Sequence, residues 1–299
     1  MLRSILVPLD GSPFGERALP LACSIAARAG SRLVLAHVHV AAAPLVTDAL
    51  PGFDDLLDNE QRMSEQAYLT EIAARVAAPG VAVTTTVLDD PVVTALHGYA
   101  LDNSVDLIVM TTHGRGAISR FWLGSVADTL VRRTTLPVLL ERPRELARRP
   151  DQQRAIQRIL IPLDGSALAE QIIPCATELG ALSDAEYLLV QAVEPAMARH
   201  VGGNGSHPSP EHDQQTFAQA RQYLEGIARR MRLGGLRVRT DVLLGPAGAS
   251  ILDAAHTQAV DLIAMETHGR GGITRLLLGS IADWVLRGTL VPVLLHRPS

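Results

Sequence analysis

The sequence predicts an α/β protein made of two copies of one doubly wound domain, each with an open, parallel, five-stranded Rossmann-like sheet. Two observations support this fold class. First, ILVPLDGS at residues 5–12 recurs as ILIPLDGS at 159–166, and DLIVMTTHGRG at 106–116 recurs as DLIAMETHGRG at 261–271. Second, short apolar runs alternate with amphipathic helical patterns in each copy, which is typical of a parallel sheet covered on both faces.

Local signals in the first copy give the order of its elements. An apolar run predicts a strand over residues 5–9, Ser12 follows as a helix N-cap, and the first helix ends at Gly30. A second strand is expected over residues 33–40, and a loose stretch follows it over residues 41–58.

The remaining elements continue this alternation. A helix around residues 69–76 precedes a strand at 81–88, and Pro91 opens a helix that extends to about residue 100. The last three elements are a strand, a helix and a strand, over residues 106–110, 125–133 and 136–140. The second copy repeats this order, with Pro246 at the matching helix start.

The join between the copies is expected to be a linker. Residues 142–155 read RPRELARRPDQQRA, which is rich in arginine and proline and poor in apolar residues. We therefore expect domain 1 over residues 1–143, a linker over 144–155 and domain 2 over 156–299.

The composition excludes several classes of function. The chain has 299 residues, a formal net charge of −4 and 3% aromatic residues. It is therefore not expected to bind nucleic acid or an anionic membrane. All 27 basic residues are arginine, because the sequence contains no lysine. A P-loop lysine and a Schiff-base lysine are excluded, so any phosphate must be held by backbone N–H groups, hydroxyls or arginine.

The two cysteines and the apolar runs predict a cytoplasmic protein. Cys23 and Cys175 lie in apolar helical patterns and are expected to be small buried hydrophobes in a reducing compartment. The N-terminal apolar run is too short for a signal peptide, and no apolar run reaches the roughly 18 residues of a membrane span.

Glycine-containing breaks follow the first and fourth strands of each copy. In open parallel sheets, ligands bind in the crevice at the carboxyl ends of the strands. Gly114 lets backbone approach a ligand closely, and Gly124-Ser125 stands at the expected start of a helix, whose unpaired N–H groups bind anions. We predict a phosphate cradle that needs no lysine. The alternative, in which these glycines only turn the chain, stays open.

These residues resemble the universal stress protein family. The resemblance is carried by VPLDGS after the first strand and by HG, nine residues and GS after the fourth. It covers nearly the whole chain twice, so the chain is identified as a tandem two-domain member of the ATP-binding type, with the universal stress protein fold. The resemblance implies ATP as ligand, with or without Mg²⁺, and pairing of the fifth strands across the domains as an internal pseudo-dimer. Assembly into a homodimer stays open.

The resemblance also implies which residues contact the nucleotide. The aspartate after the first strand would lie beside adenine and ribose, and the glycine-containing segment would hold the phosphates. In domain 1 the matching positions are Pro8, Leu9, Asp10, Val38, Met110, Thr111, His113, Gly114, Arg115, Gly124, Ser125 and Val126. In domain 2 they are Pro162, Leu163, Asp164, Ala192, Met265, His268, Gly269, Gly279, Ser280 and Ile281.

The two domains depart from the family pattern in different ways. Its first glycine is Thr111 in domain 1 and Glu266 in domain 2. A glutamate would repel a polyphosphate unless it points away or shares a metal ion, so domain 1 is expected to bind nucleotide better. Asp10 and Asp164 have an alternative role, which is to fix the strand-to-helix turn. Asp54, Asp55 and Asp58 are expected in a solvated loop.

Three functions are compatible with these observations. The first is an ATP-binding regulatory module of the stress response, whose bound nucleotide selects a conformation or a protein partner. The second is a slow ATPase, although no residue pair is typical of a tuned base with a positioned water. The third is a protein-interaction scaffold with an empty cleft. No catalytic residue and no metal site of the protein's own are predicted.

Overall fold

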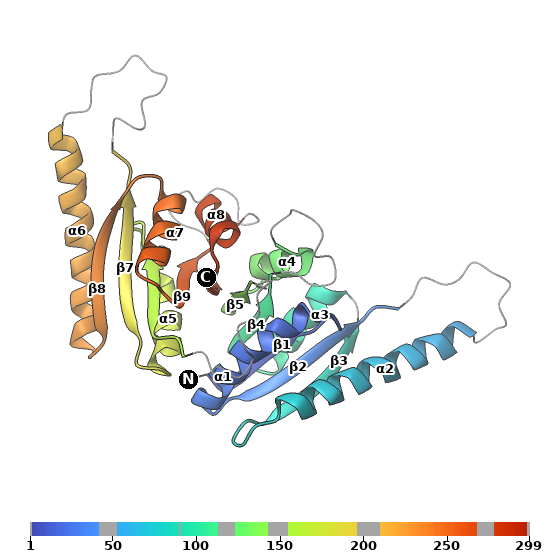
Figure 1. Cartoon of the computed structure of the whole chain (residues 1–299). Helices are drawn as coiled ribbons and strands as arrows, with labels where there is room; N and C mark the ends of the chain where they lie inside the picture. The colour runs from blue at the N-terminus through green and yellow to red at the C-terminus, as the bar shows by residue number, and fades with distance from the viewer. Residues whose placement is uncertain are drawn as a thin grey trace, which may run out of the picture. The chain divides into compact units, whose positions relative to one another are not determined.

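The structure is a computed structural model of the whole chain, drawn in Figure 1. It describes residues 2–41, 53–89, 91–112, 123–142, 155–195, 210–267 and 278–297. The chain divides into two compact units, Met1–Arg154 and Ala155–Ser299. Residues 144–154 of the expected linker lie outside the described residues.

The first unit contains one parallel five-stranded sheet. Its strands are β1 (Ser4–Pro8), β2 (Arg32–His39), β3 (Val83–Asp89), β4 (Leu107–Thr111) and β5 (Val138–Glu141). They lie in the order β3-β2-β1-β4-β5, and every neighbouring pair is parallel. The chain therefore winds outward from β1 to β3 and then in the opposite direction from β4 to β5. This reversal puts the carboxyl ends of β1 and β4 beside a crevice.

Helices connect these strands. They are η1 (Gly15–Ala18, a 3₁₀-helix), α1 (Leu19–Ala29), α2 (Phe53–Val76), α3 (Val92–Asp102) and α4 (Ser125–Arg133). Helix α2 packs on β2 and β3, while α3 and α4 contact each other. Strand β1 is apolar and almost fully buried, as expected for a sheet covered on both faces.

The second unit repeats this topology. Its strands are β6 (Arg158–Pro162), β7 (Glu186–Val193), β8 (Arg237–Leu244), β9 (Leu262–Glu266) and β10 (Val293–His296), in the order β10-β9-β6-β7-β8. Its helices are η2 (Ala169–Gln171), α5 (Ile172–Ala181), α6 (Pro210–Leu233), α7 (Ala247–Thr257) and α8 (Ser280–Gly288). All its neighbouring strand pairs are parallel as well. The predicted α/β class with two doubly wound parallel sheets is confirmed.

Three local expectations were wrong. Helix α1 begins at Leu19, and the Ser12 hydroxyl accepts a hydrogen bond from Gly15 N at 3.1 Å, so Ser12 holds the preceding turn instead of capping α1. Helix α2 begins at Phe53, inside the stretch expected to be loose. Its first turns contain helix-forming residues, but they are polar and so lack the apolar face on which the expectation relied. Cys23 and Cys175 are half-buried instead of buried.

No helix in the described part of the chain is both long and apolar enough to cross a membrane. The pairing of the fifth strands across the two domains stays a prediction.

Gly30 and Gly98 test the backbone geometry of the first unit. Gly30 ends α1 with a φ of +64°, as the sequence predicts, whereas Gly98 lies inside α3; a Cβ would meet nothing within 4 Å at either position. We expect Gly30→Ala to lower the free energy of unfolding by about 1 kcal/mol, because a side chain strains the left-handed conformation. Gly98→Ala should raise it by about 0.5–1 kcal/mol. Urea denaturation of the full chain measures both changes, and equal effects would contradict the left-handed cap.

Candidate functional site

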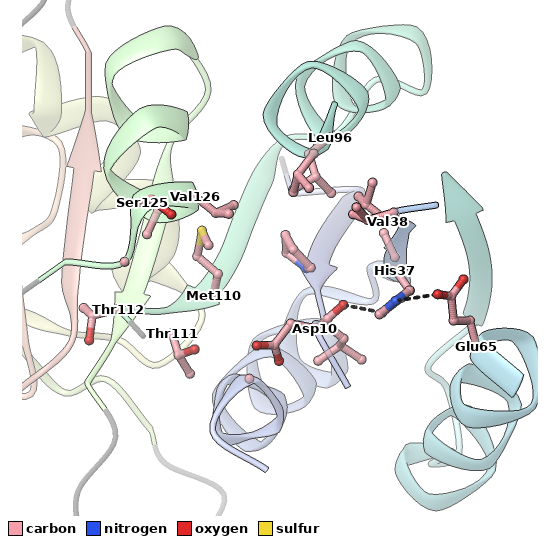
Figure 2. A pocket seen from close by; sticks show the side chains of 18 of the residues that line it. Asp10, His37, Val38, Glu65, Leu96, Met110, Thr111, Thr112, Ser125 and Val126 are labelled. Atoms are coloured by element: carbon pink, nitrogen blue, oxygen red, sulfur yellow. Dashed lines mark hydrogen bonds and ion pairs between the residues drawn. The ribbon is translucent and has the colours of Figure 1, made fainter. Parts of the chain in front are cut away.

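A cavity of about 890 Å³ lies in the first unit, at the carboxyl ends of β1, β2 and β4. Helices α2, α3 and α4 complete its walls (Figure 2). The cavity is lined by nine positions that the family resemblance singled out: Pro8, Leu9, Asp10, Val38, Met110, Thr111, Gly124, Ser125 and Val126. His113, Gly114 and Arg115 lie outside the described residues.

The middle of the cavity is an apolar slot. Figure 2 shows the side chains of Val38, Leu96, Met110 and Val126 directed toward this space from β2, α3, β4 and α4. Val92, at the start of α3, also lines the cavity. A slot with apolar walls and few polar groups is suited to a flat ring system.

One end of the cavity can bind an anion. Helix α4 begins there, with Gly124 as its N-cap in extended conformation, and glycine has no side chain that could cap the first N–H groups. Gly124 N donates to Thr112 O at 2.6 Å, which fixes the helix start against the end of β4. Ser125, the first residue of α4, is exposed, and Ser125 and Thr111 both line the cavity. Helix N-terminal N–H groups with neighbouring hydroxyls are a recurrent phosphate-binding arrangement.

Asp10 fixes the turn that follows β1. Its Oδ1 accepts hydrogen bonds from Ser12 N at 3.0 Å and Ser12 Oγ at 2.7 Å. Gly15 is required beside it, because a Cβ there would lie 2.5 Å from Asp10 Oδ1. Asp164 makes the same bonds to Ser166 N at 2.9 Å and Ser166 Oγ at 2.6 Å. Both aspartates therefore hold the turn, and contact with a ligand by Asp10 is an additional role because Asp10 lines the cavity.

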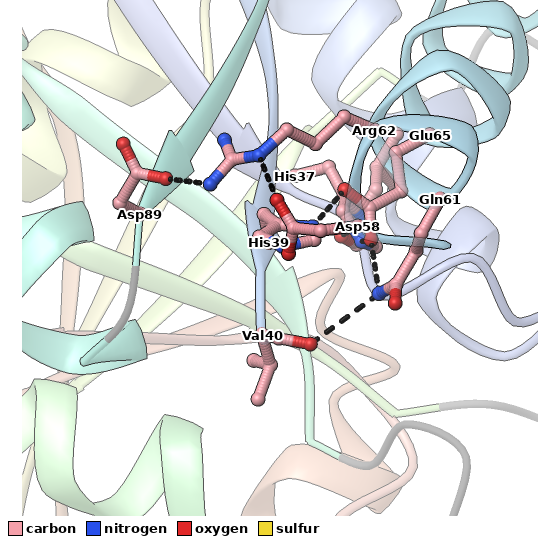
Figure 3. Close-up of polar contacts among 9 residues, drawn as sticks. His37, His39, Val40, Asp58, Gln61, Arg62, Glu65 and Asp89 are labelled. Atoms are coloured by element: carbon pink, nitrogen blue, oxygen red, sulfur yellow. Dashed lines mark hydrogen bonds and ion pairs between the residues drawn. The ribbon is translucent and has the colours of Figure 1, made fainter. Parts of the chain in front are cut away.

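Four charged or titratable residues that the sequence analysis did not assign to the site connect β2 to α2. We call His37, His39, Asp58 and Glu65 the histidine–carboxylate cluster (Figure 3). His39 Nδ1 lies 2.9 Å from Glu65 Oε2, and its Nε2 lies 2.7 Å from Asp58 Oδ1. His37 Nδ1 lies 2.8 Å from Leu9 O, and its Nε2 lies 3.5 Å from Glu65 Oε1. His37 and Glu65 both line the cavity.

The cluster is electrostatically coupled. Burial alone would lower the pKa of His39, but hydrogen bonds to Asp58 and Glu65 raise it above its usual value. Burial acts to raise the pKa of Glu65, but hydrogen bonds from Gln61 and His39 lower it overall. Hydrogen bonds from Arg62 and His39 lower the pKa of Asp58. Since both nitrogens of His39 face carboxylates, both must carry hydrogen, and the ring is a cation held between two anions.

The expectation that Asp58 lies in a solvated loop was therefore wrong. Asp58 is in α2, where it accepts hydrogen bonds from His39 and from Arg62 Nε at 2.9 Å. Arg62 extends the contacts to Asp89 at the end of β3, at 2.7 Å. The only signal in the sequence was the spacing of the two histidines, which a strand directs to one face.

The second unit carries the corresponding positions, but its walls differ. Pro162, Leu163 and Asp164 follow β6, Ala192 lies in β7, Met265 lies in β9, and Gly279, Ser280 and Ile281 start α8. His268 and Gly269 lie outside the described residues. In place of His37, His39 and Glu65, this unit has Gln191, Val193 and Ala220.

Glu266 is buried at the end of β9, and only 2% of its side chain is exposed. Its Oε1 lies 2.8 Å from His296 Nδ1, while its Oε2 is buried with no hydrogen-bond partner in the described part of the chain. Burial raises the pKa of Glu266 despite the contact with His296. Burial and the charge of Glu266 raise the pKa of Cys175 to about 11. The second unit therefore holds a buried acid where the first unit has Thr111.

Within the described ranges, no group of three histidine, cysteine, aspartate or glutamate side chains could hold a metal ion.

His39 and Glu65 should stabilise the first unit in a pH-dependent way. A double-mutant cycle of His39→Val and Glu65→Ala, which imports the residues of the second unit, should give a coupling of about 1–2 kcal/mol at pH 6. Because the pKa of His39 is raised, the coupling energy is lost as pH rises through that pKa. Because the pKa of Glu65 is lowered, the coupling energy is also lost as pH falls well below 4.5. Urea denaturation at pH 6 and pH 9 measures it, and an equal or larger coupling at pH 9 would contradict the ion pair.

Glu266 should destabilise the second unit at alkaline pH. Its raised pKa means that folding favours the protonated form, so stability falls as pH rises above 4.5. We expect Glu266→Gln to be more stable than the wild type at pH 8, by about 1–3 kcal/mol, and to lose that advantage toward pH 4. Glu225→Gln is the opposite case, because hydrogen bonds from Arg232 and Thr240 lower the pKa of Glu225. Thermal unfolding at both pH values distinguishes them, and a Glu266→Gln effect independent of pH would refute the assignment.

Comparisons with known proteins agree with this architecture. A universal stress protein of Mycobacterium tuberculosis is 30% identical over 207 residues, which cover 67% of this chain and 64% of that relative, or just under two thirds of its length. A universal stress protein of Synechocystis is 24% identical over 314 residues, covering 99% of this chain and 100% of the relative. The crystal structure of a universal stress protein from Archaeoglobus fulgidus superposes with a TM-score of 0.70 at 18% identity, covering 100% of this chain and 97% of that one.

The family model described as "Universal stress protein family" matches residues 1–142 and again residues 155–297. Together the two matches cover nearly the whole chain. The chain belongs to the universal stress protein family and contains two of its domains.

Proposed function

We propose that the first unit binds an adenine nucleotide, with ATP as the main ligand, and that the bound nucleotide regulates the protein. One observation carries the proposal: a single cavity joins an apolar slot to a helix N-terminus. The slot fits a purine ring between Val38, Leu96 and Met110. The start of α4, with Gly124 and Ser125, fits the phosphates, which need hydrogen-bond donors in a protein without lysine.

The chemistry of the donor set also fits a polyphosphate that carries Mg²⁺. Phosphate oxygens would supply most ligands of the ion, and Thr111 and Ser125 both line the cavity with hydroxyl-bearing side chains. Asp10, already oriented by Ser12, is positioned to accept a hydrogen bond from a ribose hydroxyl. The family resemblance implies the contacts of Asp10 with ribose and of Ser125 with phosphate.

Regulation is favoured over turnover by the location of the charged groups. Among the described residues, the titratable side chains that line the cavity are Asp10, His37 and Glu65. Asp10 is engaged in the turn, while His37 and Glu65 are on β2 and α2, away from the α4 end that fits the phosphates. Hydrolysis would need a base and a positioned water beside the terminal phosphate. We therefore propose a cytoplasmic stress-response module in which nucleotide shifts the population of conformations that partners recognise.

The second unit is proposed to bind nucleotide more weakly. Glu266 occupies the position of Thr111 and is buried beside His296. A polyphosphate bound nearby would add negative charge next to this buried carboxyl group, which is unfavourable whenever Glu266 is ionised. The second unit would then serve mainly as a structural scaffold, and its cleft would bind nucleotide with low affinity.

Two equivalent substitutions test which unit binds. Val126 lines the first cavity, and Ile281 is the equivalent residue of α8, with 38% of its surface exposed. We expect Val126→Trp to lower ATP affinity about tenfold or more, because the indole fills the slot, and Ile281→Trp to leave the main binding event unchanged. Isothermal titration calorimetry on the full chain measures both, with circular dichroism as the control for folding.

The opposite result, in which Ile281→Trp abolishes ATP binding and Val126→Trp does not, would overturn the assignment to the first unit. No heat of binding at millimolar ATP in the wild type would favour a nucleotide-free scaffold instead. Phosphate release measured on the same samples would identify a slow ATPase if it is lost in Val126→Trp.

A further inference from the structure

Glu65 stands in the cavity wall on helix α2, separated from the start of α4 by the apolar slot. We infer that Glu65 selects the base: its carboxylate accepts a hydrogen bond from an exocyclic amino group, so the first unit prefers 6-aminopurine to 6-oxopurine nucleotides. This inference rests on the proposed nucleotide binding. It assigns a specificity role to a residue that the sequence motifs do not include.

The carboxylate of Glu65 is held in place and kept ionised. Its Oε2 accepts from His39 Nδ1 at 2.9 Å, and its Oε1 accepts from Gln61 Nε2 at 2.8 Å. Gln61 is itself fixed, because its amide nitrogen also donates to Val40 O at 3.3 Å. A carboxylate accepts about four hydrogen bonds, so both oxygens of Glu65 keep acceptor capacity.

His37 lies between the end of β1 and Glu65. Leu9 O is an acceptor, so His37 Nδ1, at 2.8 Å from it, must donate the hydrogen. The ring is then oriented with Nε2 toward Glu65 Oε1 at 3.5 Å. His37 therefore packs against the Glu65 carboxylate and helps to fix it at the cavity wall.

The burial of the wall makes it discriminating. Only 11% of the Glu65 side chain is exposed, so water competes weakly for its carboxylate. An amino group at C6 would donate to the carboxylate. A carbonyl at the same position would bring a second acceptor against a negative charge and leave both unsatisfied. Sites that offer a polar partner to one substituent reject analogues without it far better than apolar pockets reject a change in size.

The second unit supplies a natural contrast. It has Ala220 in place of Glu65 and Gln191 in place of His37, so the position equivalent to Glu65 carries no carboxylate. Selectivity for the amino group is therefore assigned to the first unit alone.

A structural role for the cluster is the competing explanation, since it also joins α2 to β2. The two explanations predict different ligand preferences. A residue that only holds the helix would change the affinities for all nucleotides together, whereas a base-reading residue changes their ratio.

ATP and ITP form the sharpest pair of probes, because they differ only at the C6–N1 edge of the base: ATP has an amino group and an unprotonated N1, whereas ITP has a carbonyl and an N1–H. We would measure the Kd of each by titration calorimetry at pH 7.5, on the full chain carrying Ile281→Trp to block the second cleft. We expect ATP to bind about tenfold or more tightly than ITP. Glu65→Gln should weaken ATP binding and strengthen ITP binding, because an amide can both accept and donate. Glu71→Gln, which makes the same charge change at an exposed position of α2, should keep the wild-type ratio.

Equal affinities for ATP and ITP without the Glu65 substitution would overturn this inference and leave nucleotide binding intact. This comparison needs no change at Glu65, so it stands even if Glu65→Gln folds poorly. An unchanged ratio in a folded Glu65→Gln protein would overturn the inference as well. Absence of ATP binding in the wild type would overturn the proposed function and this inference with it.

Discussion

The short pairing between β1 and β4 is the constraint on which the site depends. These strands are in register at Ile5–Leu107 and Leu6–Ile108, at their amino-terminal halves. At that end, Asp106 Oδ2 accepts from the backbone N–H groups of Arg3 and Ser4 at 2.6 and 3.0 Å, which holds the strands together. Beyond Leu6, β1 remains paired with β2 and β4 with β5, because the chain reverses its winding between them. The space left between the carboxyl ends becomes the cavity.

The second unit shows which parts of this arrangement are scaffold. Asp261 Oδ2 accepts from the backbone N–H groups of Gln157 and Arg158 at 3.0 Å each, as Asp106 does in the first unit. Asp164 holds the following turn as Asp10 does. The cavity wall diverged, because Glu266 replaces Thr111 at the end of the fourth strand. The two units thus share the groups that orient the backbone and differ in some of the side chains around the crevice.

The sequence predicted the fold well because the fold depends on local signals. Apolar runs marked the buried strands, and the left-handed end of α1 required a residue such as Gly30. The polar start of α2 was missed because the prediction relied on an apolar face. The role of Asp58 could not be read from the sequence, because its contact with His39 joins residues 19 positions apart across a helix and a strand. Such a contact depends on how α2 packs on β2, which periodicity alone does not specify.

The attachment of α2 to β2 does not by itself explain why the histidine–carboxylate cluster is charged. Removing the His39 cation and the Glu65 carboxylate from water is costly, and a buried ion pair often stabilises no more than a well-packed apolar pair. In the second unit the corresponding helix–strand contact is apolar. Val193 of β7 stands at the position of His39 and Ala220 of α6 at the position of Glu65, and each is 5% exposed where α6 packs on β7. Attachment of the helix therefore does not require charge. What distinguishes the first unit is that Glu65 also borders the cavity, where a fixed carboxylate can recognise a donor.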